Sequence, residues 1–318
     1  MSLPEPAHPP AKTLSVIVPV YYNADSLPVL FDRLRGVEQQ LLQRHGVALQ
    51  LIFVNDGSRD GSQAALLEIK RRRPEATVVR LSRNFGAVHA SRAGFGFVSG
   101  DAFLILAADL QDPPELLLEM VPRWLGGSKF VIAVRASRQD PWTSRAYSWL
   151  YYRLLRLLVL PGYPERGFDI ALMDRAMLEP MRNCSKNAFT PLLAYWLGYQ
   201  PDVVSYHRPK REHGRSGWTF TKKVKAFLDV MLGFSVTPIR LISAVGVLVA
   251  GASFAYGVAV IVSALFGNIP VSGFAALASL ITFLLGTIIL MLGIIGEYLW
   301  RVFDEVNRRP ESVIDEVL

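Results

Sequence analysis

Cysteine is almost absent from this chain. Cys184 is the only cysteine among 318 residues, so neither an intrachain disulfide nor a cysteine-rich zinc site can form. The sequence also lacks the HExxH pattern of zinc hydrolases, the Cys-x-x-Cys pattern and the Walker A loop. These absences argue against a disulfide-built scaffold, a zinc protease and a P-loop ATPase.

Signatures of dinucleotide and nucleic-acid binding are missing as well. Gly94, Gly96 and Gly100 have the wrong spacing for the dinucleotide fingerprint, and they precede a predicted strand instead of following one. The sequence has no zinc finger, RNP-type aromatic motif or helix-turn-helix pattern. We therefore expect no nucleic-acid partner. The net charge of +7 then indicates another kind of anionic partner.

Hydrophobic residues make up 51% of the chain and charged residues 19%. This balance is too apolar for an ordinary soluble enzyme and too charged for a protein that lies wholly in a membrane, and it excludes disorder as the main state. We expect a soluble domain and a separate membrane part. Residues 1–12 are rich in proline without an apolar run, which predicts a flexible tail and no signal peptide.

Strand-like and helix-like segments alternate in the first half of the chain. The predicted strands cover residues 14–20, 49–55, 77–81, 102–107 and 130–134, and the predicted helices cover 26–45, 62–73, 88–98 and 114–125. Such alternation predicts an α/β, Rossmann-like fold with a mostly parallel sheet and helices on both faces. Ligands of such sheets bind at the carboxyl ends of the strands.

Two long apolar runs follow, over residues 241–266 and 271–296. Each has 26 residues without a charge, and about 20 suffice to cross a bilayer. We predict two transmembrane helices joined by residues 267–270; two buried helices of a soluble protein are the weaker alternative. The flanking cations are Arg208, Lys210, Arg211, Arg215, Lys222, Lys223, Lys225 and Arg240 on one side and Arg301, Arg308 and Arg309 on the other. The positive-inside rule then predicts a multi-pass protein of the inner (plasma) membrane with the α/β domain and both termini in the cytoplasm.

Two stretches combine cations with aromatic and aliphatic side chains, over residues 144–160 and 221–234. Cationic amphipathic helices of this kind lie in the bilayer interface, and packing on the sheet is the alternative for each. We therefore divide the chain into an α/β domain over 13–220, an amphipathic segment over 221–240, a membrane hairpin over 241–300 and a cytoplasmic tail over 301–318.

Polar motifs follow the predicted strands. The first strand ends at Pro19 and is followed by Tyr21 and Asn23, which offer a ring and an amide, although a simple turn is the alternative. Residues 55–61 contain two acids, but an EF-hand would need a glutamate where Leu67 stands. Asp56 at a strand end is instead suited to accept hydrogen bonds from a base or ribose, with an Asx turn as the alternative.

A third polar motif, which contains acidic residues, follows the fourth predicted strand. In an extended segment, Asp109 and Gln111 would project the same way and share one divalent cation. That cation would neutralise a diphosphate leaving group. Asp112 before Pro113 is placed to cap a helix.

A basic cluster is formed by Lys210, Arg211 and Arg215 next to Ser216. Solvation at the inner leaflet of the membrane is the alternative for most lysines of this region, but it explains the close cluster less well. Arginines at this density beside Ser216 can bind a phosphate bidentately. Because the cluster precedes the membrane hairpin, we expect either a lipid headgroup or a lipid-linked phosphate substrate.

These motifs together resemble the polyisoprenyl-phosphate glycosyltransferases of family 2, which include dolichyl-phosphate mannose synthase and the bacterial bactoprenol glucosyltransferases. The segments that carry the resemblance are 16–21 (VIVPVY), 55–61 (NDGSRDG), 83–86 (RNFG), 108–115 (ADLQDPPE) and 296–298 (GEY). The resemblance implies an A-type glycosyltransferase fold, a nucleotide-sugar donor, Mg²⁺ or Mn²⁺, and a polyprenyl phosphate acceptor. It also implies a homo-oligomer, a tetramer in similar bacterial enzymes.

The resemblance also assigns roles to residues. The nucleoside would be held by Pro19, Tyr21, Asn23 and Asp56, and the metal and diphosphate by Asp109 and Gln111. The acceptor phosphate would be held by Arg135, Arg145, Arg211 and Ser216. Asp169 would lie near the sugar. Asp109, Gln111, Asp169 and Arg211 would be the catalytic set. Three positions depart from the family pattern, which often has an acid at Ala107, a glutamate at Asn23 and an arginine at Ala171. Ala107 bears on how the metal is coordinated, and Asn23 and Ala171 bear on base recognition and sugar identity.

The chemistry fits an inverting transfer. A phosphate monoester has a second pKa of about 6, so a polyprenyl phosphate arrives ionised and needs no strong base. We expect in-line attack on the anomeric carbon of a UDP-sugar by undecaprenyl phosphate. A non-catalytic membrane scaffold that keeps the nucleotide-sugar fold is the alternative from another class. A processive polysaccharide synthase fits less well, because it needs more membrane helices and a Gln-x-x-Arg-Trp segment.

Overall fold

The structure is a computed structural model that describes residues 12–136, 142–165, 167–185, 188–206, 231, 233–235, 237–266, 273–307 and 309–318. The chain divides into two compact units. The first is Met1–Lys223 with Pro310–Leu318, and the second is Val224–Arg309. The expected tail over 1–12 lies outside the described residues except for Lys12, and the expected hairpin link over 267–270 lies wholly outside them.

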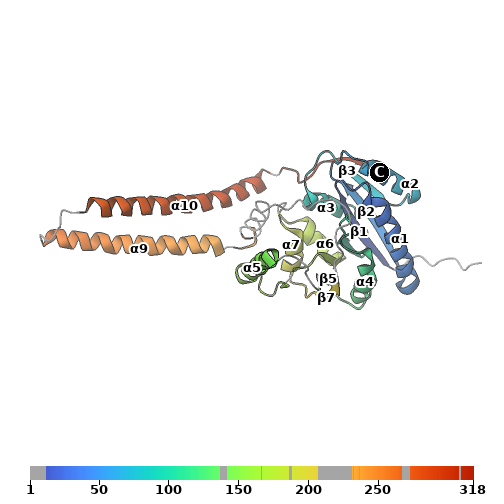
Figure 1. The fold of residues 1–318 in the computed structure, drawn as a ribbon, viewed down its shortest axis with the longest axis horizontal. Coiled ribbons are helices and arrows are strands. Elements are labelled where there is room, and N and C mark those ends of the chain that lie inside the picture. Colours follow the sequence, from blue (N-terminus) through green and yellow to red (C-terminus); the bar gives the residue numbers. More distant parts are fainter. Residues whose placement is uncertain are drawn as a thin grey trace, which may run out of the picture. The chain divides into compact units, whose positions relative to one another are not determined.

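The first unit is built on one eight-stranded sheet in the order β7-β5-β6-β4-β1-β2-β3-β8 (Figure 1). Its strands are β1 (Lys12–Val20), β2 (Val47–Asn55), β3 (Thr77–Leu81), β4 (Ala102–Ile105), β5 (Phe130–Arg135), β6 (Ile170–Asp174), β7 (Asp202–Tyr206) and β8 (Ile314–Val317). Four neighbouring pairs are parallel and three are antiparallel. The predicted α/β class with a mostly parallel sheet is therefore confirmed.

The register places the functional loops at one edge of the sheet. Val20, the last residue of β1, lies opposite Asn55, the last residue of β2. On the other side of β1, Ile17 pairs with Ile105, so β4 ends at the same edge. β6 runs antiparallel to β4, which brings the start of β6 to this edge as well. Segments from the first and second halves of the chain therefore meet there.

Helices of the first unit pack on both faces of the sheet. The helices of this unit are α1 (Ser26–His45), α2 (Ser62–Arg72), α3 (Ala87–Phe95), α4 (Leu117–Leu125), α5 (Trp142–Leu158), α6 (Leu178–Arg182) and α7 (Thr190–Trp196), with short 3₁₀ turns η1 (Pro114–Leu116) and η2 (Arg175–Met177). Val16 and Val18 belong to the main buried core with α1, α2 and α4. Ile17 between them points to the opposite face and meets α3 at Gly94, where a Cβ atom would lie 2.5 Å from the Ile17 side chain. Only glycine allows α3 this close to the sheet.

The last residues differ from the tail that the sequence predicts over 301–318. β8 pairs antiparallel with β3 and forms one edge of the sheet. Its placement is supported by Arg80, which donates hydrogen bonds to Asp315, and by Arg92, which is paired with Glu311. A four-residue strand is too short to be identified by alternation, and its partner strand lies more than 230 residues earlier in the chain.

The second unit contains the apolar helices α9 (Thr237–Leu265) and α10 (Phe274–Val306). Within them, Ile239–Ala259 and Phe283–Val306 are long and apolar enough to cross a membrane. Large apolar side chains such as Phe254 are mostly exposed, as expected for a lipid-facing surface. The two helices approach closely at Gly246, where a Cβ atom would lie 2.7 Å from Met291 Cε.

Candidate active site

Two loops at the carboxyl ends of β1 and β2 are tied together. The backbone N–H of Tyr22 donates to Ser58 Oγ at 3.2 Å, and that of Asn23 donates to Ser62 Oγ at 2.9 Å. The ring of Tyr21 is 47% exposed and lies edge-on to the ring of Tyr22. Tyr22 has a φ of 55°, a left-handed conformation that is costly for a residue with a side chain. The tied loops therefore hold an exposed aromatic ring at the sheet edge.

Asn23 and Asp56 both accept hydrogen bonds from backbone N–H groups, and at Asn23 the turn stated as the alternative is confirmed. The Oδ1 atom of Asn23 accepts a hydrogen bond from the Tyr21 N–H at 3.0 Å, so this amide forms the turn. Asp56 is 2% exposed, and its two carboxylate oxygens accept from the N–H groups of Phe85 and Gly86 at 2.7 and 2.9 Å. Each oxygen has a second lone pair, so these bonds do not use up the acceptor capacity of Asp56.

Gly57 lets the loop with Asp56 meet the loop at residues 83–86. Its φ is +66°, and a Cβ atom there would lie 2.5 Å from the backbone carbonyl carbon of Arg83. A side chain at this position would therefore separate the two loops. Asp56 and Gly57 together fix the position of the Arg83–Gly86 segment at the site.

The segment with Asp109 and Gln111 is a turn, so the expected extended conformation is wrong. β4 ends at Ile105, and Leu110 has a φ of 61°. The reversal at Leu110 breaks the alternation that would align the two side chains. Asp109 Oδ1 instead accepts the Gln111 N–H at 3.2 Å, which gives the turn an Asx-type bond. Leu110 is held in this strained conformation by burial in the core.

Four side chains form a connected carboxylate network beside this turn. Arg135 at the end of β5 donates to both oxygens of Asp169, each at 2.6 Å. The hydroxyl of Tyr206, the last residue of β7, lies 2.9 Å from Asp169 Oδ2 and 3.0 Å from Asp112 Oδ1. The network joins β5, β7, the loop after β4 and the loop before β6.

Burial and neighbouring charges shift the pKa values of the groups in this network. Burial, helped by the charges of Asp169 and Asp109, raises the pKa of Asp112 to about 7. Burial and the carboxylates of Asp112 and Asp169 raise the pKa of Tyr206. Burial acts to lower the pKa of Arg135, but the hydrogen bonds and charge of Asp169, together with the charges of Tyr206 and Asp112, outweigh burial and raise the guanidinium pKa. A partly protonated Asp112 can donate to Tyr206 while Tyr206 donates to Asp169, so one hydroxyl serves both acids.

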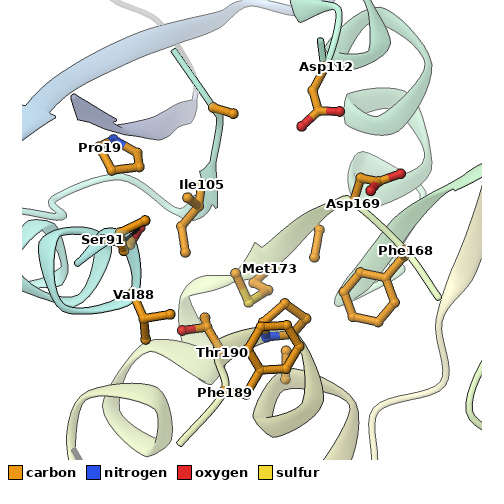
Figure 2. A pocket seen from close by; sticks show the side chains of 15 residues that line it. Pro19, Val88, Ser91, Ile105, Asp112, Phe168, Asp169, Met173, Phe189 and Thr190 are labelled. Atoms are coloured by element: carbon orange, nitrogen blue, oxygen red, sulfur yellow. Dashed lines mark hydrogen bonds between the residues drawn. The ribbon is translucent and has the colours of Figure 1, made fainter. Parts of the chain in front are cut away.

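A pocket of about 250 Å³ lies against these acids. Figure 2 shows Asp112 and Asp169 on one side of it and Pro19 and Ile105 on the sheet. Ala107 and Ala171, which depart from the family pattern, both line this pocket. The structure thus brings Pro19, Asp169 and the loop after β4 together.

Some predicted site residues lie outside the described residues, and others have partners within the structure. Arg211 and Ser216 lie outside the described residues, as does the side chain of Arg145 in α5. Arg135, predicted to face the acceptor phosphate, is paired with Asp169. Asp112, predicted as a helix cap, precedes Pro113, the N-cap residue of η1, and contacts Tyr206.

The residues present fit a divalent cation that is shared with a substrate. Within the described part of the chain no group of three or more His, Cys, Asp or Glu side chains is placed to hold a metal. Asp109 and Gln111 nevertheless offer two hard oxygen ligands in one turn, and Asp112 adds negative charge nearby. Mg²⁺ is commonly held by one or two carboxylates together with substrate phosphates, so a complete protein cage is not required.

Comparison with known proteins identifies the family. A model of the glycosyl transferase family 2 domain matches residues 15–181, just over half of the chain. The chain belongs to glycosyltransferase family 2. This membership confirms the resemblance drawn from the sequence and the A-type glycosyltransferase fold that it implies.

Two relatives match this family 2 chain over nearly its whole length, and a solved structure matches about two thirds of it. The bactoprenol glucosyl transferase of the SfII prophage in Shigella flexneri is 33% identical, covering 95% of this chain and 97% of its own. An undecaprenyl-phosphate 4-deoxy-4-formamido-L-arabinose transferase of Serratia proteamaculans (strain 568) is 33% identical, covering 97% of this chain and 95% of its own. The solved mannosyl-3-phosphoglycerate synthase of Rubrobacter xylanophilus covers 69% of this chain and 71% of its own, with 18% identity and a TM-score of 0.48.

Tyr206 is the main site residue that sequence reasoning missed. No motif surrounds it, and it follows Asp112 by 94 residues. Its position as the last residue of a strand, directly before the basic cluster, is the one available signal. Sequence alone does not predict that β7 runs parallel to β5 and so ends at the functional edge.

Proposed function

We propose that this family 2 glycosyltransferase transfers a sugar from a nucleotide-sugar, a UDP-sugar, to undecaprenyl phosphate with inversion at the anomeric carbon. The product would be a lipid-linked monosaccharide for cell-envelope glycan or lipid modification. The observation that carries the proposal is the meeting of Asp109, Gln111 and the Asp112–Tyr206–Asp169 network at one sheet edge. Two relatives with one-third identity are named for transfer to bactoprenol or undecaprenyl phosphate, which supports this acceptor.

The donor would lie across the ends of β1, β2 and β4. The exposed ring of Tyr21 is suited to stack on the base, and Asp56 retains lone pairs that can accept from the nucleoside. Asp109 and Gln111 would hold Mg²⁺ or Mn²⁺, which supplies positive charge to the diphosphate leaving group. The turn at Leu110 fixes these two ligands before the substrate arrives.

The acceptor would enter from the side of the basic residues. Its phosphate is ionised near neutral pH, so the protein's task is to orient it and to balance charge. We assign this role to Arg145, Arg211 and Ser216. Arg135 donates two of its five N–H groups to Asp169, and we propose that the remaining ones face the acceptor phosphate.

The apolar helices would hold this reaction at a membrane surface. Helices α9 and α10 meet the length and apolarity for crossing a bilayer. In α5, Trp149, Leu150 and Leu157 are exposed while Leu155 is buried, so this helix has an apolar face available for the lipid interface. We propose a multi-pass protein of the inner membrane with its sheet unit in the cytoplasm, assembled as a homo-oligomer.

Transfer by the purified full-length protein tests the function directly. The assay combines radiolabelled UDP-glucose or another UDP-sugar, undecaprenyl phosphate and Mg²⁺, and it measures label in the lipid phase. We expect labelled lipid and stoichiometric UDP, with the product's anomeric configuration opposite to that of the donor. Binding of UDP-sugars without any turnover would favour the scaffold alternative. Retention of configuration would refute the inverting mechanism but not the transfer.

A substitution separates the acceptor role from the donor role. Arg211→Ala should raise the KM for undecaprenyl phosphate at least tenfold and leave the Kd for UDP within a factor of two. Arg44→Ala on α1, a cation away from the sheet edge, is the matched control and should change neither value. An equal loss of donor and acceptor binding in Arg211→Ala would contradict the placement of Arg211.

A further inference from the structure

The pocket beside the carboxylate network is apolar over most of its wall. Eleven of its fifteen lining residues are apolar, and the four polar ones are Ser91, Asp112, Asp169 and Thr190. Ser91 already donates its hydroxyl to the carbonyl of Ala87 at 2.7 Å. Figure 2 shows Asp112 and Asp169 on one side of the space and Val88, Met173 and Phe189 across from them. A ligand that fits this pocket must therefore be polar beside the two acids and mostly apolar across from them, where the hydroxyls of Ser91 and Thr190 are the polar groups.

The size and position of the pocket limit what that ligand is. About 250 Å³ is less than the roughly 300–1,000 Å³ of pockets that take drug-sized molecules. This space suits a single sugar unit and is too small for a complete nucleotide-sugar. The pocket also reaches the metal-binding turn, because Ala107 and Asp112, on either side of Asp109 and Gln111, line it. The group next to the diphosphate is thus the group that enters.

Hydrogen-bonding capacity distinguishes the sugar from the other candidate, the first isoprene unit of the acceptor. An isoprene in this pocket has no hydrogen-bond donor to offer to Asp112 and Asp169. Sugar hydroxyls, in contrast, donate hydrogen bonds to carboxylates. Each carboxylate accepts about four such bonds, so Asp112 and Asp169 can accept them in addition to their bonds to Tyr206 and Arg135.

The apolar wall then sets a condition on the sugar. An unmodified hexose carries a hydroxyl on almost every ring carbon, and a hydroxyl that faces Val88, Met173 and Phe189 loses water without gaining a partner. A hydrogen or methyl group in its place loses nothing and buries apolar surface. The wall therefore favours a ring with an apolar group on the side away from the acids.

We propose that this pocket selects a donor sugar in which an apolar-ended group replaces a ring hydroxyl, that is, a deoxy or N-acyl sugar. The inference rests on the proposed function, since it assumes that a nucleotide-sugar occupies the sheet edge. It goes further by naming the class of sugar and the residues that choose it. Ala171 is central, because it lies on β6 with its side chain in the pocket beside Met173, whereas Leu172 between them points into the core.

Competing donors test the selection. The full-length protein is given UDP-glucose, UDP-N-acetylglucosamine and UDP-6-deoxyglucose, and both Kd and kcat/KM are measured for each. One apolar group in a fitted pocket discriminates by about 10–200-fold, so we expect at least a tenfold preference for one of the two substituted sugars. Equal or better use of UDP-glucose would overturn the inference and leave the transfer function intact. A tenfold preference in Kd without transfer of any sugar would support the inference and refute the function.

A pocket-filling variant ties the preference to these residues. Ala171→Leu should lower kcat/KM for the preferred sugar at least tenfold, reduce its advantage over UDP-glucose, and leave the Kd for UDP unchanged. Unchanged UDP binding reports that the variant is folded. Ala64→Leu, the same change at an exposed position of α2, is the control and should alter neither value. An unaltered preference in Ala171→Leu would overturn the proposal.

Discussion

The substitution Tyr206→Phe removes one hydroxyl from the centre of the carboxylate network. That hydroxyl lies 3.0 Å from Asp112 and 2.9 Å from Asp169, and Asp112 is 5% exposed. A hydrogen bond to a charged group contributes about 1.5–3 kcal/mol to stability. We therefore expect the free energy of unfolding to fall by about 1.5–3 kcal/mol.

Thermal unfolding of the full-length protein in detergent measures this loss. For a domain of about 150–250 residues, 1 kcal/mol shifts the midpoint by about 2–4 °C, so a loss of about 1.5–3 kcal/mol lowers the midpoint by about 3–12 °C. Activity should fall as well, because Asp169 is held by Tyr206 from one side and Arg135 from the other. We expect a kcat at least tenfold lower, with the KM for the donor changed less than threefold.

Tyr195→Phe is the matched control for this prediction. Tyr195 also donates one hydroxyl bond, to the carbonyl of Gly162 at 2.6 Å, but its partner is neutral and lies outside the network. Its loss should cost about 0.5–1.5 kcal/mol and leave kcat unchanged. If Tyr206→Phe unfolds no earlier than Tyr195→Phe and keeps the wild-type kcat, the bridging role of Tyr206 is refuted.

Four further outcomes are expected. Asp109→Asn, or EDTA added to the wild type, should abolish sugar transfer, and full activity in either case would contradict the metal role of Asp109. Gly57→Ala should lower the thermal midpoint and weaken UDP binding by at least fivefold, because its Cβ meets the Arg83 backbone; unchanged UDP affinity would argue against that contact. Thr190→Val should raise the free energy of unfolding by about 1 kcal/mol, since the buried Thr190 hydroxyl has no hydrogen-bond partner among the described residues; a loss of stability would contradict this reading. Glu311→Ala should lower the free energy of unfolding by about 3 kcal/mol, because it removes the carboxylate that pairs with Arg92, whose side chain is 4% exposed. A variant as stable as the wild type would count against the ion pair.

The first half of the fold follows directly from the sequence. Buried parallel strands such as residues 14–20 and 49–55 are short β-branched runs between amphipathic helices, and this local pattern is sufficient to predict them. β6, β7 and β8 were not predicted. Their places depend on pairing with β4, β5 and β3, and long-range partners leave no periodic signal in a strand of four or five residues.

The candidate site was predictable in its parts but not in its connections. Asp56, Asp109 and Asp169 were identified as candidates from motifs at strand ends and from the family resemblance. The geometry at Leu110 and the bond from Tyr206 were not, because both arise from tertiary packing that overrides local conformation. At Asn23 the alternative stated from the sequence, a turn, is confirmed, because its amide oxygen accepts the Tyr21 N–H. Residue type predicts which groups are chemically suitable, and the packed core decides which way they face.

The strand β8 also has a consequence for the order in which the protein is made. The sheet gains its last strand from residues 314–317, which the ribosome synthesises only after both apolar helices. Until then β3 is an unpaired sheet edge, which is open to pairing with other chains, and Arg92 lacks its carboxylate partner. Nascent chains that stall before the apolar helices are finished therefore cannot complete this sheet, so only chains that already contain both apolar helices can assemble the full sheet unit.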